Sequence, residues 1–390
     1  MSGVPSTVTV YNNPTIQKMS VNYDFGVYMQ DSWTIKRLTL NPGARVQWFK
    51  SGMDETSMGA GRFVPARFFV AQPDLPKWGA HWAPRFSAAY DLFVDGKTAL
   101  KGSVSKYYYP RTNGWATRYS NSGQTTESRQ WFDADLIPGT ATRSGIVLAT
   151  NNDGIAQDNE IGPSGTTNFG QRSDRNPVDG LKRNSNWEYT ASVQHQLVAN
   201  MSMTASWFRR TWRDMEITDR GQITLADYTS FTLPMPDFSI DPTLKGVLDP
   251  NEVITVYNLS TAKLGVYGSS QVDYNSSGAF NATGEPDQAW YTGYEVSFSA
   301  RFARTTIFGG YTIERNVNRF CDNNDNPNGQ TASDLYKGTT VARGGRFCDG
   351  SKLNVPFSQE FKLSGNYPLP YGVDFAAVLQ AYPGDERVIT

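Results

Sequence analysis

Apolar and polar residues alternate along several stretches of this chain, and this period of two residues is the feature that most limits its fold. The clearest stretch is "NWEYTASVQHQLVANMSMTASWFRRTW", residues 186–212. In it Trp187 and Tyr189 share one face, and Glu188 lies on the other. A helical period of 3.6 would scatter the apolar side chains around the helix axis. The stretch is therefore predicted to form two β-strands, each with one apolar and one polar face, on either side of Ala199-Asn200.

The same alternation predicts five pairs of strands, each joined by a short turn. The pairs are 22–35 with 38–50, 84–94 with 98–109, 185–198 with 201–218, 290–302 with 305–317, and 357–368 with 373–382. Between the pairs lie long loops rich in Gly, Ser, Asn, Asp and Pro, without a clear period. These loops span about 51–83, 110–184, 219–289 and 318–356.

Short and long connections alternate, so the four long loops lie at the same end of the predicted sheet. A compact soluble domain rarely carries even one structureless loop longer than about 15 residues. Short periplasmic turns, long extracellular loops and strands that are apolar outside and polar inside are typical of outer-membrane barrels. We therefore predict an all-β fold, an antiparallel transmembrane β-barrel with about ten strands. Lys101, Glu188 and Arg301 suit a wet lumen, or alternatively the solvated face of a soluble sheet.

The composition agrees with this fold class. Aromatic residues make up 13% of the chain, and there are 35 Gly and 21 Pro. The mean hydropathy of −0.49 is low because only alternate residues of a barrel strand face lipid. The net charge of −1 predicts no nucleic-acid partner. Aromatic residues near predicted strand ends suit interfacial girdles: Trp33, Trp48, Tyr107, Tyr108, Tyr109, Trp187, Trp207, Trp212, Trp290 and Tyr291.

Several blocks resemble the C-terminal barrel of TonB-dependent outer-membrane receptors. Within that family they are most similar to the Oar-like group, which carries a carboxypeptidase-regulatory-like N-terminal domain. The most specific blocks are "VYMQDSW" (27–33) and "RFSAAYDLFVDGKTALKGSVSKY" (85–107). The resemblance covers nearly the whole chain. It implies the outer membrane of a Gram-negative cell, a barrel of about 22 strands around a plug, and transport energised from the inner membrane.

The chain departs from the pattern of that family. It shows about ten strands, no plug domain, no energy-coupling box, no signal peptide, and no aromatic-ended final strand before "AYPGDERVIT". We therefore expect residues 1–390 to form part of a larger outer-membrane barrel. The expected partners are outer-membrane lipid, an unknown small or oligomeric ligand, and an inner-membrane energy-coupling complex reached through a plug outside this chain. Alternatives are a passive porin-like barrel, an outer-membrane adhesin, and a secreted soluble β-sandwich binding module.

No arrangement of residues typical of catalysis is visible, so the chain is predicted not to be an enzyme. His81 and His195 are the only histidines, and neither belongs to a recognisable Ser/His/Asp or Cys/His grouping. The sequence contains no phosphate-binding loop and no dinucleotide fingerprint. We predict no catalytic, cofactor-binding or metal residues.

Two cysteines, Cys321 and Cys348, share the "RFCD" context within one long loop. This repeated context suggests a disulfide that closes the loop, which would contribute roughly 3–4 kcal/mol by restricting the unfolded state. Two free thiols are the alternative.

Two further loop features have more than one interpretation. In residues 149–163, Asn151, Asp153, Gly154 and Glu160 have the spacing of positions 3, 5, 6 and 12 of a calcium-binding hand. Ala149 occupies the first position, and a polar surface loop is the favoured alternative. The loops also carry aromatic residues that suit a sugar platform or, as we favour, packing between loops: Trp78, Trp82, Trp115, Tyr119 and Trp131.

Overall fold

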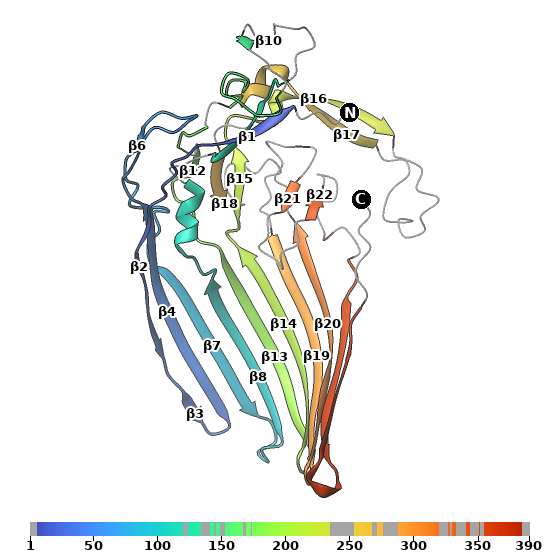
Figure 1. Cartoon of the computed structure of the whole chain (residues 1–390). Coiled ribbons are helices and arrows are strands. Elements are labelled where there is room, and N and C mark those ends of the chain that lie inside the picture. Colours follow the sequence, from blue (N-terminus) through green and yellow to red (C-terminus); the bar gives the residue numbers. More distant parts are fainter. Residues whose placement is uncertain are drawn as a thin grey trace.

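The main body of the protein is one long-stranded antiparallel sheet whose loops gather at one end (Figure 1). This architecture is seen in a computed structural model. The structure describes residues 6–119, 124–133, 141–143, 146–148, 153–166, 169–172, 174–234, 253–266, 271–275, 288–319, 327, 330–332, 341–343, 351 and 355–383. The all-β prediction is confirmed.

Each strand of this main sheet pairs with the strands next to it along the chain. The order is β2–β4–β7–β8–β13–β14–β19–β20–β23–β24, with β3 paired to β4. The strands are β2 (Met19–Gln30), β3 (Trp33–Ile35), β4 (Leu38–Met53), β7 (His81–Asp91), β8 (Thr98–Tyr108), β13 (Ser185–Val198), β14 (Met201–Arg213), β19 (Gln288–Phe302), β20 (Thr305–Arg319), β23 (Ser358–Pro368) and β24 (Asp374–Ala381). Within the described residues β2 and β24 each have one neighbour in this order, so the sheet is not closed.

The five predicted tight turns all lie at the end of the sheet opposite the loops (Figure 1). Each contains a residue with positive φ, which turns the chain within a few residues. These residues are Lys36, Val94 and Gly96, Asn200, Ala303, and Tyr371 and Gly372. The predicted alternation of short turns and long loops is therefore confirmed.

The pairing register separates an apolar face from a polar face. Val193 lies directly opposite Leu100 and Ala205, whereas Gln194 lies opposite Ala99 and Thr204. Residues that lie opposite one another in an antiparallel pair project to the same side. The apolar side chains of one face therefore form a continuous surface across all the strands.

This apolar face is exposed in the chain by itself. Met29 is 78% exposed, Val27 61% and Phe25 52%. Soluble monomers rarely expose contiguous apolar patches larger than a few hundred Å². A face of this kind, ten strands wide, requires an apolar environment such as lipid.

Two of the predicted strands are wrong in extent. The predicted strand 201–218 ends at Arg213, because Asp214 adopts a φ of 54° and turns the chain out of the main sheet. The predicted strand 22–35 breaks at Asp31, whose carboxylate accepts hydrogen bonds from the Ser32 amide (2.8 Å) and the Trp33 indole (2.6 Å).

The long loops contain regular structure, contrary to the expectation of structureless segments. Short strands there give too few residues for a period to be visible in the sequence. They form the three-stranded sheet β12 (Arg175–Pro177), β18 (Gln271–Asn275) and β15 (Glu216–Arg220), and the pairs β5 (Thr56–Met58) with β6 (Arg67–Phe69), β10 (Ala141–Arg143) with β11 (Ile146–Leu148), β16 (Tyr228–Pro234) with β17 (Val253–Leu259), and β21 (Gln330–Ala332) with β22 (Val341–Arg343). The loop strand β9 (Thr126–Gln130) pairs with β1 (Thr7–Tyr11), which precedes β2 in the chain.

Short 3₁₀ helices complete the described elements. They are η1 (Asn113–Tyr119), η2 (Leu225–Asp227), η3 (Thr261–Val266) and η5 (Pro370–Gly372). In the parts of the chain that the structure describes, no helix has both the length and the apolar character needed to cross a membrane.

Candidate functional site

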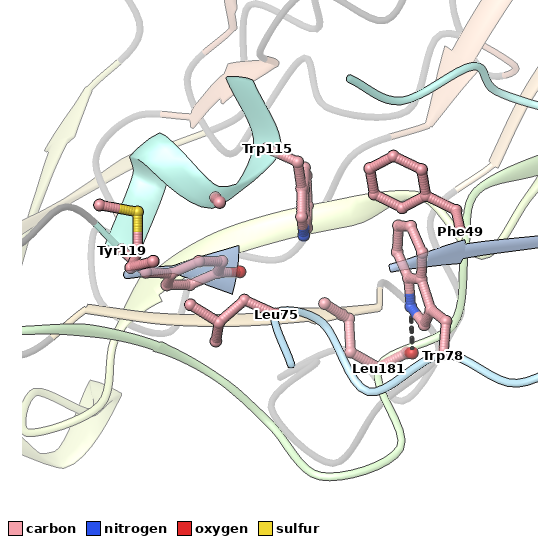
Figure 2. Close-up of a cluster of buried hydrophobic side chains, with 8 residues drawn as sticks. Phe49, Leu75, Trp78, Trp115, Tyr119 and Leu181 are labelled. Carbon is pink, nitrogen blue, oxygen red and sulfur yellow. Dashed lines mark hydrogen bonds between the residues drawn. The ribbon is translucent and has the colours of Figure 1, made fainter. Parts of the chain in front are cut away.

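The loops dock onto the end of the main sheet through a buried aromatic cluster. Trp115 and Tyr119 of η1 are 3% and 1% exposed, and Trp115 lies beside Trp78 and Phe49 (Figure 2). The rings of Trp78 and Trp115 stack with centroids 5.6 Å apart. The indole nitrogen of Trp78 donates a hydrogen bond of 2.8 Å to the carbonyl of Leu181 (Figure 2). The cluster therefore joins three loop segments to the end of β4.

These contacts decide between the two interpretations of the loop aromatics. Trp78, Trp115 and Tyr119 are used for packing between loops, as we favoured, and do not form an exposed platform. Trp131 also has an internal contact, because its indole nitrogen lies 3.2 Å from Glu160 Oε2. Trp82 is 63% exposed, but it lies opposite Val46 on the apolar face.

A buried carboxylate connects three elements of the loop end. Asp273 is completely buried in β18. The guanidinium of Arg175 donates to both of its oxygens, with Nε at 3.0 and 2.9 Å and Nη2 at 2.7 Å from Oδ1. The hydroxyls of Thr218 and Tyr119 each donate a further bond of 2.7 Å. Burial and the neighbouring Asp273 carboxylate raise the pKa of Tyr119, which keeps its phenol a neutral donor.

A second network stacks two guanidinium groups on one indole. The Cζ atoms of Arg111 and Arg118 lie 4.3 and 4.2 Å from the ring centroid of Trp115. Arg111 forms a direct ion pair with Glu216, and Arg118 Nη1 lies 3.8 Å from Glu216 Oε2. Burial raises the pKa of Glu216 above its ordinary value, although both arginines oppose this shift. The network joins η1 to β15 and so anchors two long loops to each other.

Below the loops, the polar face of the sheet forms a charged wall. Arg210 pairs with Glu188, and Lys101 Nζ donates to Gln194 Oε1 over 2.6 Å. Tyr291 donates to Glu314 over 2.9 Å. This arrangement of hydrogen-bonded polar residues is typical of a surface that faces water or another polar domain, rather than a sandwich core.

A groove of about 810 Å³ opens along this wall near its β2 edge. Its polar lining includes Gln30, Asn41, Arg45, Arg85 and Ser105. The Arg85 guanidinium lies 4.6 Å from the ring centroid of Tyr107. The lining holds two arginines and one acidic residue, Asp31, so the groove presents a small net positive charge to whatever occupies the polar side of the sheet.

The predicted aromatic girdle is correct for some residues and wrong for others. Trp187 and Trp290 lie on the apolar face at the loop end, because both are opposite Thr211. Trp212 and Tyr291 instead pack with Met215 on the other side of the sheet. Successive residues of a strand point to opposite faces of the sheet. Trp212 directly follows Thr211, so its side chain lies on the face opposite that of Thr211, Trp187 and Trp290.

Both histidines lie in strands of the main sheet, His81 in β7 and His195 in β13. His81 is buried between the rings of Trp78 and Tyr108. His195 lies near the turn end of the apolar face, where its Nδ1 is 2.8 Å from Thr98 Oγ1. The predicted position of His195 is therefore confirmed.

The segment 149–163, with its calcium-like spacing, is only partly described, since Ala149 and Asn151 lie outside the described residues. The Glu160 side chain is fully buried and bonded to Trp131, and Asp153 accepts from the Ile155 amide over 2.8 Å. Across the described segments, no group of three or more His, Cys, Asp or Glu could hold a metal ion. Cys321 and Cys348 also lie outside the described residues, and their disulfide stays a prediction.

Sequence reasoning missed the two buried networks. The hydrogen-bonded and ion-paired partners in these networks are separated by 55 to 154 residues along the chain, mostly within loops that have no period. No local signal could have brought them together. By contrast, the alternation of faces along the predicted strands could have shown that Arg209 and Arg315 lie on the same face as Tyr189.

Comparison with solved structures gives several matches at low identity. The FrpB iron transporter of Neisseria meningitidis matches with 10% identity and a TM-score of 0.37, over 89% of this chain and 31% of the other. The ferric-catecholate import receptor Fiu of E. coli K12 matches with 14% identity and a TM-score of 0.40, over 92% and 34%. The siderophore receptor PirA of Acinetobacter baumannii matches with 11% identity and a TM-score of 0.39, over 92% and 42%.

This chain thus spans about a third of the length of the first two structures, 31% and 34%. No curated protein sequence matches it. At the level of families, the sequence model described as "Outer membrane beta barrel domain" matches residues 1–382. Together with an antiparallel sheet that has one continuous exposed apolar face, this match shows that the chain belongs to the outer-membrane β-barrel domain family and resides in the outer membrane.

Proposed function

We propose that this chain is part of the barrel wall of a TonB-dependent receptor that binds a solute at its loops and imports it across the outer membrane. The observation that carries the proposal is a wide, charged polar wall in a sheet whose edge strands, β2 and β24, each have one neighbour among the described strands. Unpaired backbone groups are not tolerated in lipid, so each edge strand must pair with another strand, and on this proposal the partners belong to the rest of a larger barrel. A barrel of about 22 strands encloses a lumen filled by a plug.

The charges of the wall are suited to a folded occupant. Both signs of charge occur along the wall: Arg45, Arg85 and Lys101 lie toward β2 together with Asp24 and Asp91, and Glu314 and Glu360 lie toward β24 together with Lys362. A polar domain inside the lumen could pair with both sets. The charge distribution therefore supports a plugged receptor over a simple water-filled pore.

The resemblance of "VYMQDSW" and "RFSAAYDLFVDGKTALKGSVSKY" further supports the Oar-like group of these receptors. On this proposal residues 1–390 belong to one barrel domain, and its long loops face the cell exterior. The partners would be outer-membrane lipid, a small or oligomeric ligand, and an inner-membrane energy-coupling complex that acts through a plug. The receptor would move its solute without changing it chemically.

Electrical conductance distinguishes this proposal from a passive porin-like barrel. The protein purified from outer membranes would be inserted into planar lipid bilayers. A plugged receptor should conduct almost no steady current, and moderate urea should open a large conductance reversibly as the plug unfolds. A large steady conductance before urea would contradict the proposal and favour a passive pore.

Reversing one charge in the groove tests whether the polar wall contacts a plug. Arg85→Glu should weaken contacts between wall and plug and raise the leak current before urea is added. Lys97→Glu is the matched control, because Lys97 is exposed in the β7–β8 turn. Equal leak currents in the two variants would mean that the groove does not contact a plug.

A further inference from the structure

Basic residues interrupt the apolar face of the sheet only at its loop end. By register they are Lys50, Lys106, Arg209, Arg213, Arg315 and Arg319. In the described strands of the main sheet, no Asp or Glu lies on this face. Lys50 has a carboxylate partner from a loop, Asp74, at 3.3 Å. The excess of positive charge therefore lies on the side that contacts lipid, close to the aromatic girdle.

Two of these arginines flank one threonine on three adjacent strands. Thr292 of β19 lies directly opposite Arg209 of β14 and Arg315 of β20. Arg209 Nη1 donates a hydrogen bond of 2.6 Å to Thr292 Oγ1. Neighbouring strands lie about 4.8 Å apart, so the backbones of the two arginines are roughly 10 Å apart. One small anionic group can reach both guanidinium groups.

Aromatic rings hold both arginine side chains against the sheet. The Cζ atom of Arg209 lies 5.4 Å from the ring centroid of Trp290, and that of Arg315 lies 4.7 Å from Phe357. Phe357 in turn packs against Tyr294, with ring centroids 6.4 Å apart. The guanidinium groups are thus positioned in advance at the level where amphipathic rings contact lipid headgroups.

Neither arginine has a carboxylate partner within the described residues. Arg315 Nε is buried and has no hydrogen-bond acceptor there. An unpaired cation next to lipid is costly, and such a residue commonly marks a functional site. Guanidinium groups bind phosphate through two parallel hydrogen bonds, which makes phosphate the anion that best fits this pair.

We propose that Arg209, Thr292 and Arg315 bind the phosphate of an anionic lipid headgroup. The loops of an outer-membrane barrel lie outside the cell, so the lipid belongs to the outer leaflet. Lys106 adds positive charge nearby, with its Nζ 5.9 Å from the ring centroid of Trp187. The inference depends on residence in the outer membrane and is independent of any transported solute.

Native mass spectrometry of the protein purified from outer membranes and stripped of lipid tests this site. The probe is diphosphoryl lipid A, compared with its dephosphorylated form. Arg209→Gln and Arg315→Gln should each weaken binding about fivefold, and the double variant about 30-fold, since each basic residue near a membrane surface contributes about 1 kcal/mol. Arg301→Gln, on the polar face, is the matched control and should bind as the wild type does.

Arg209→Lys and Arg315→Lys keep the charge but lose the paired hydrogen bonds, so they should show intermediate affinity. They also provide the test if the glutamine variants fail to fold. Unchanged binding by the double variant, or equal binding of the dephosphorylated lipid, would overturn the proposal. Displacement of the lipid by inorganic phosphate at equal concentration would also overturn it, because the site would then recognise the free ion.

Discussion

Among single residues, Asp273 is a fully buried carboxylate with several polar contacts at the loop end. It accepts from Arg175, Thr218 and Tyr119 while completely buried. Removing one partner of a buried pair leaves an uncompensated charge, which costs about 3–5 kcal/mol. We expect Asp273→Asn to destabilise the loop sheet by this amount, measured as faster hydrogen exchange in β12, β15 and β18. Asp179→Asn is the control, since that side chain is 99% exposed; equal exchange in both variants would contradict the role of Asp273.

Glu127 of β9 should make the stability of the loop end depend on pH. Burial alone would raise its pKa, but hydrogen bonds from Arg129, Ser164 and Thr166 outweigh burial and hold the pKa below the ordinary value of 4.5. A lowered folded-state pKa stabilises the fold above that ordinary value, and the stabilisation disappears as the pH falls through the folded-state pKa.

We therefore expect protection of residues 164–166 from proteolysis to fall as the medium is acidified below pH 4.5. Glu127→Gln should remove this pH dependence and weaken protection at neutral pH by roughly 1.5–3 kcal/mol, the range for hydrogen bonds to charged groups. Glu55→Gln, an exposed carboxylate, is the control. A wild-type profile that is flat from neutral pH to pH 3 would rule out the expected linkage.

The sequence predicted the position of single residues well only in the long strands, where alternate residues point to opposite faces of the sheet. The position of His195 on the apolar face followed from its alternation with Val193. Asp273 and Glu127 could not be found, because their partners come from distant loops or from loop segments without a period. The composition of the loops favoured a packing role for Trp115, but its contacts with Arg111 and Arg118 depend on the folded loops.

At the scale of elements, the hairpins were predictable because long strands repeat the two-residue period many times. The break at Asp214 was missed because alternation resumes in β15, which belongs to another sheet. Periodicity shows that a strand exists but does not show which sheet it joins. The short loop strands, many of three to five residues, were missed for lack of length.

The β13–β14 turn offers a direct test at this scale. Asn200 has a φ of 63°, a conformation that asparagine and glycine adopt easily and β-branched residues do not. Asn200→Val should destabilise the folded sheet by about 1–2 kcal/mol, whereas Asn200→Gly should stay near the wild type. The measurement is urea unfolding of the protein in lipid vesicles. Equal midpoints for the two variants would mean that the turn does not depend on this conformation.

At the scale of the whole molecule, two properties define the protein: a continuous apolar face and a polar wall with charged pairs. The sequence predicted both, together with the position of the long loops. It could not predict how those loops pack over the sheet end (Figure 1), because that arrangement depends on buried ion pairs between distant segments. Among the described strands, β2 and β24 are the edges of the sheet, so the closure of the barrel is a proposal.

The central claim is that the two faces of the sheet contact lipid and a polar lumen. Spin labels placed one at a time at residues 188–194 of β13 test it most directly, with Cys321 and Cys348 replaced by serine and the protein in lipid bilayers. Collision with oxygen, which concentrates in lipid, should peak at Tyr189, Ala191 and Val193. A water-soluble nickel chelate should reach only the residues between them. If the chelate reaches both sets of positions equally, the apolar face is not covered by lipid and the account is wrong.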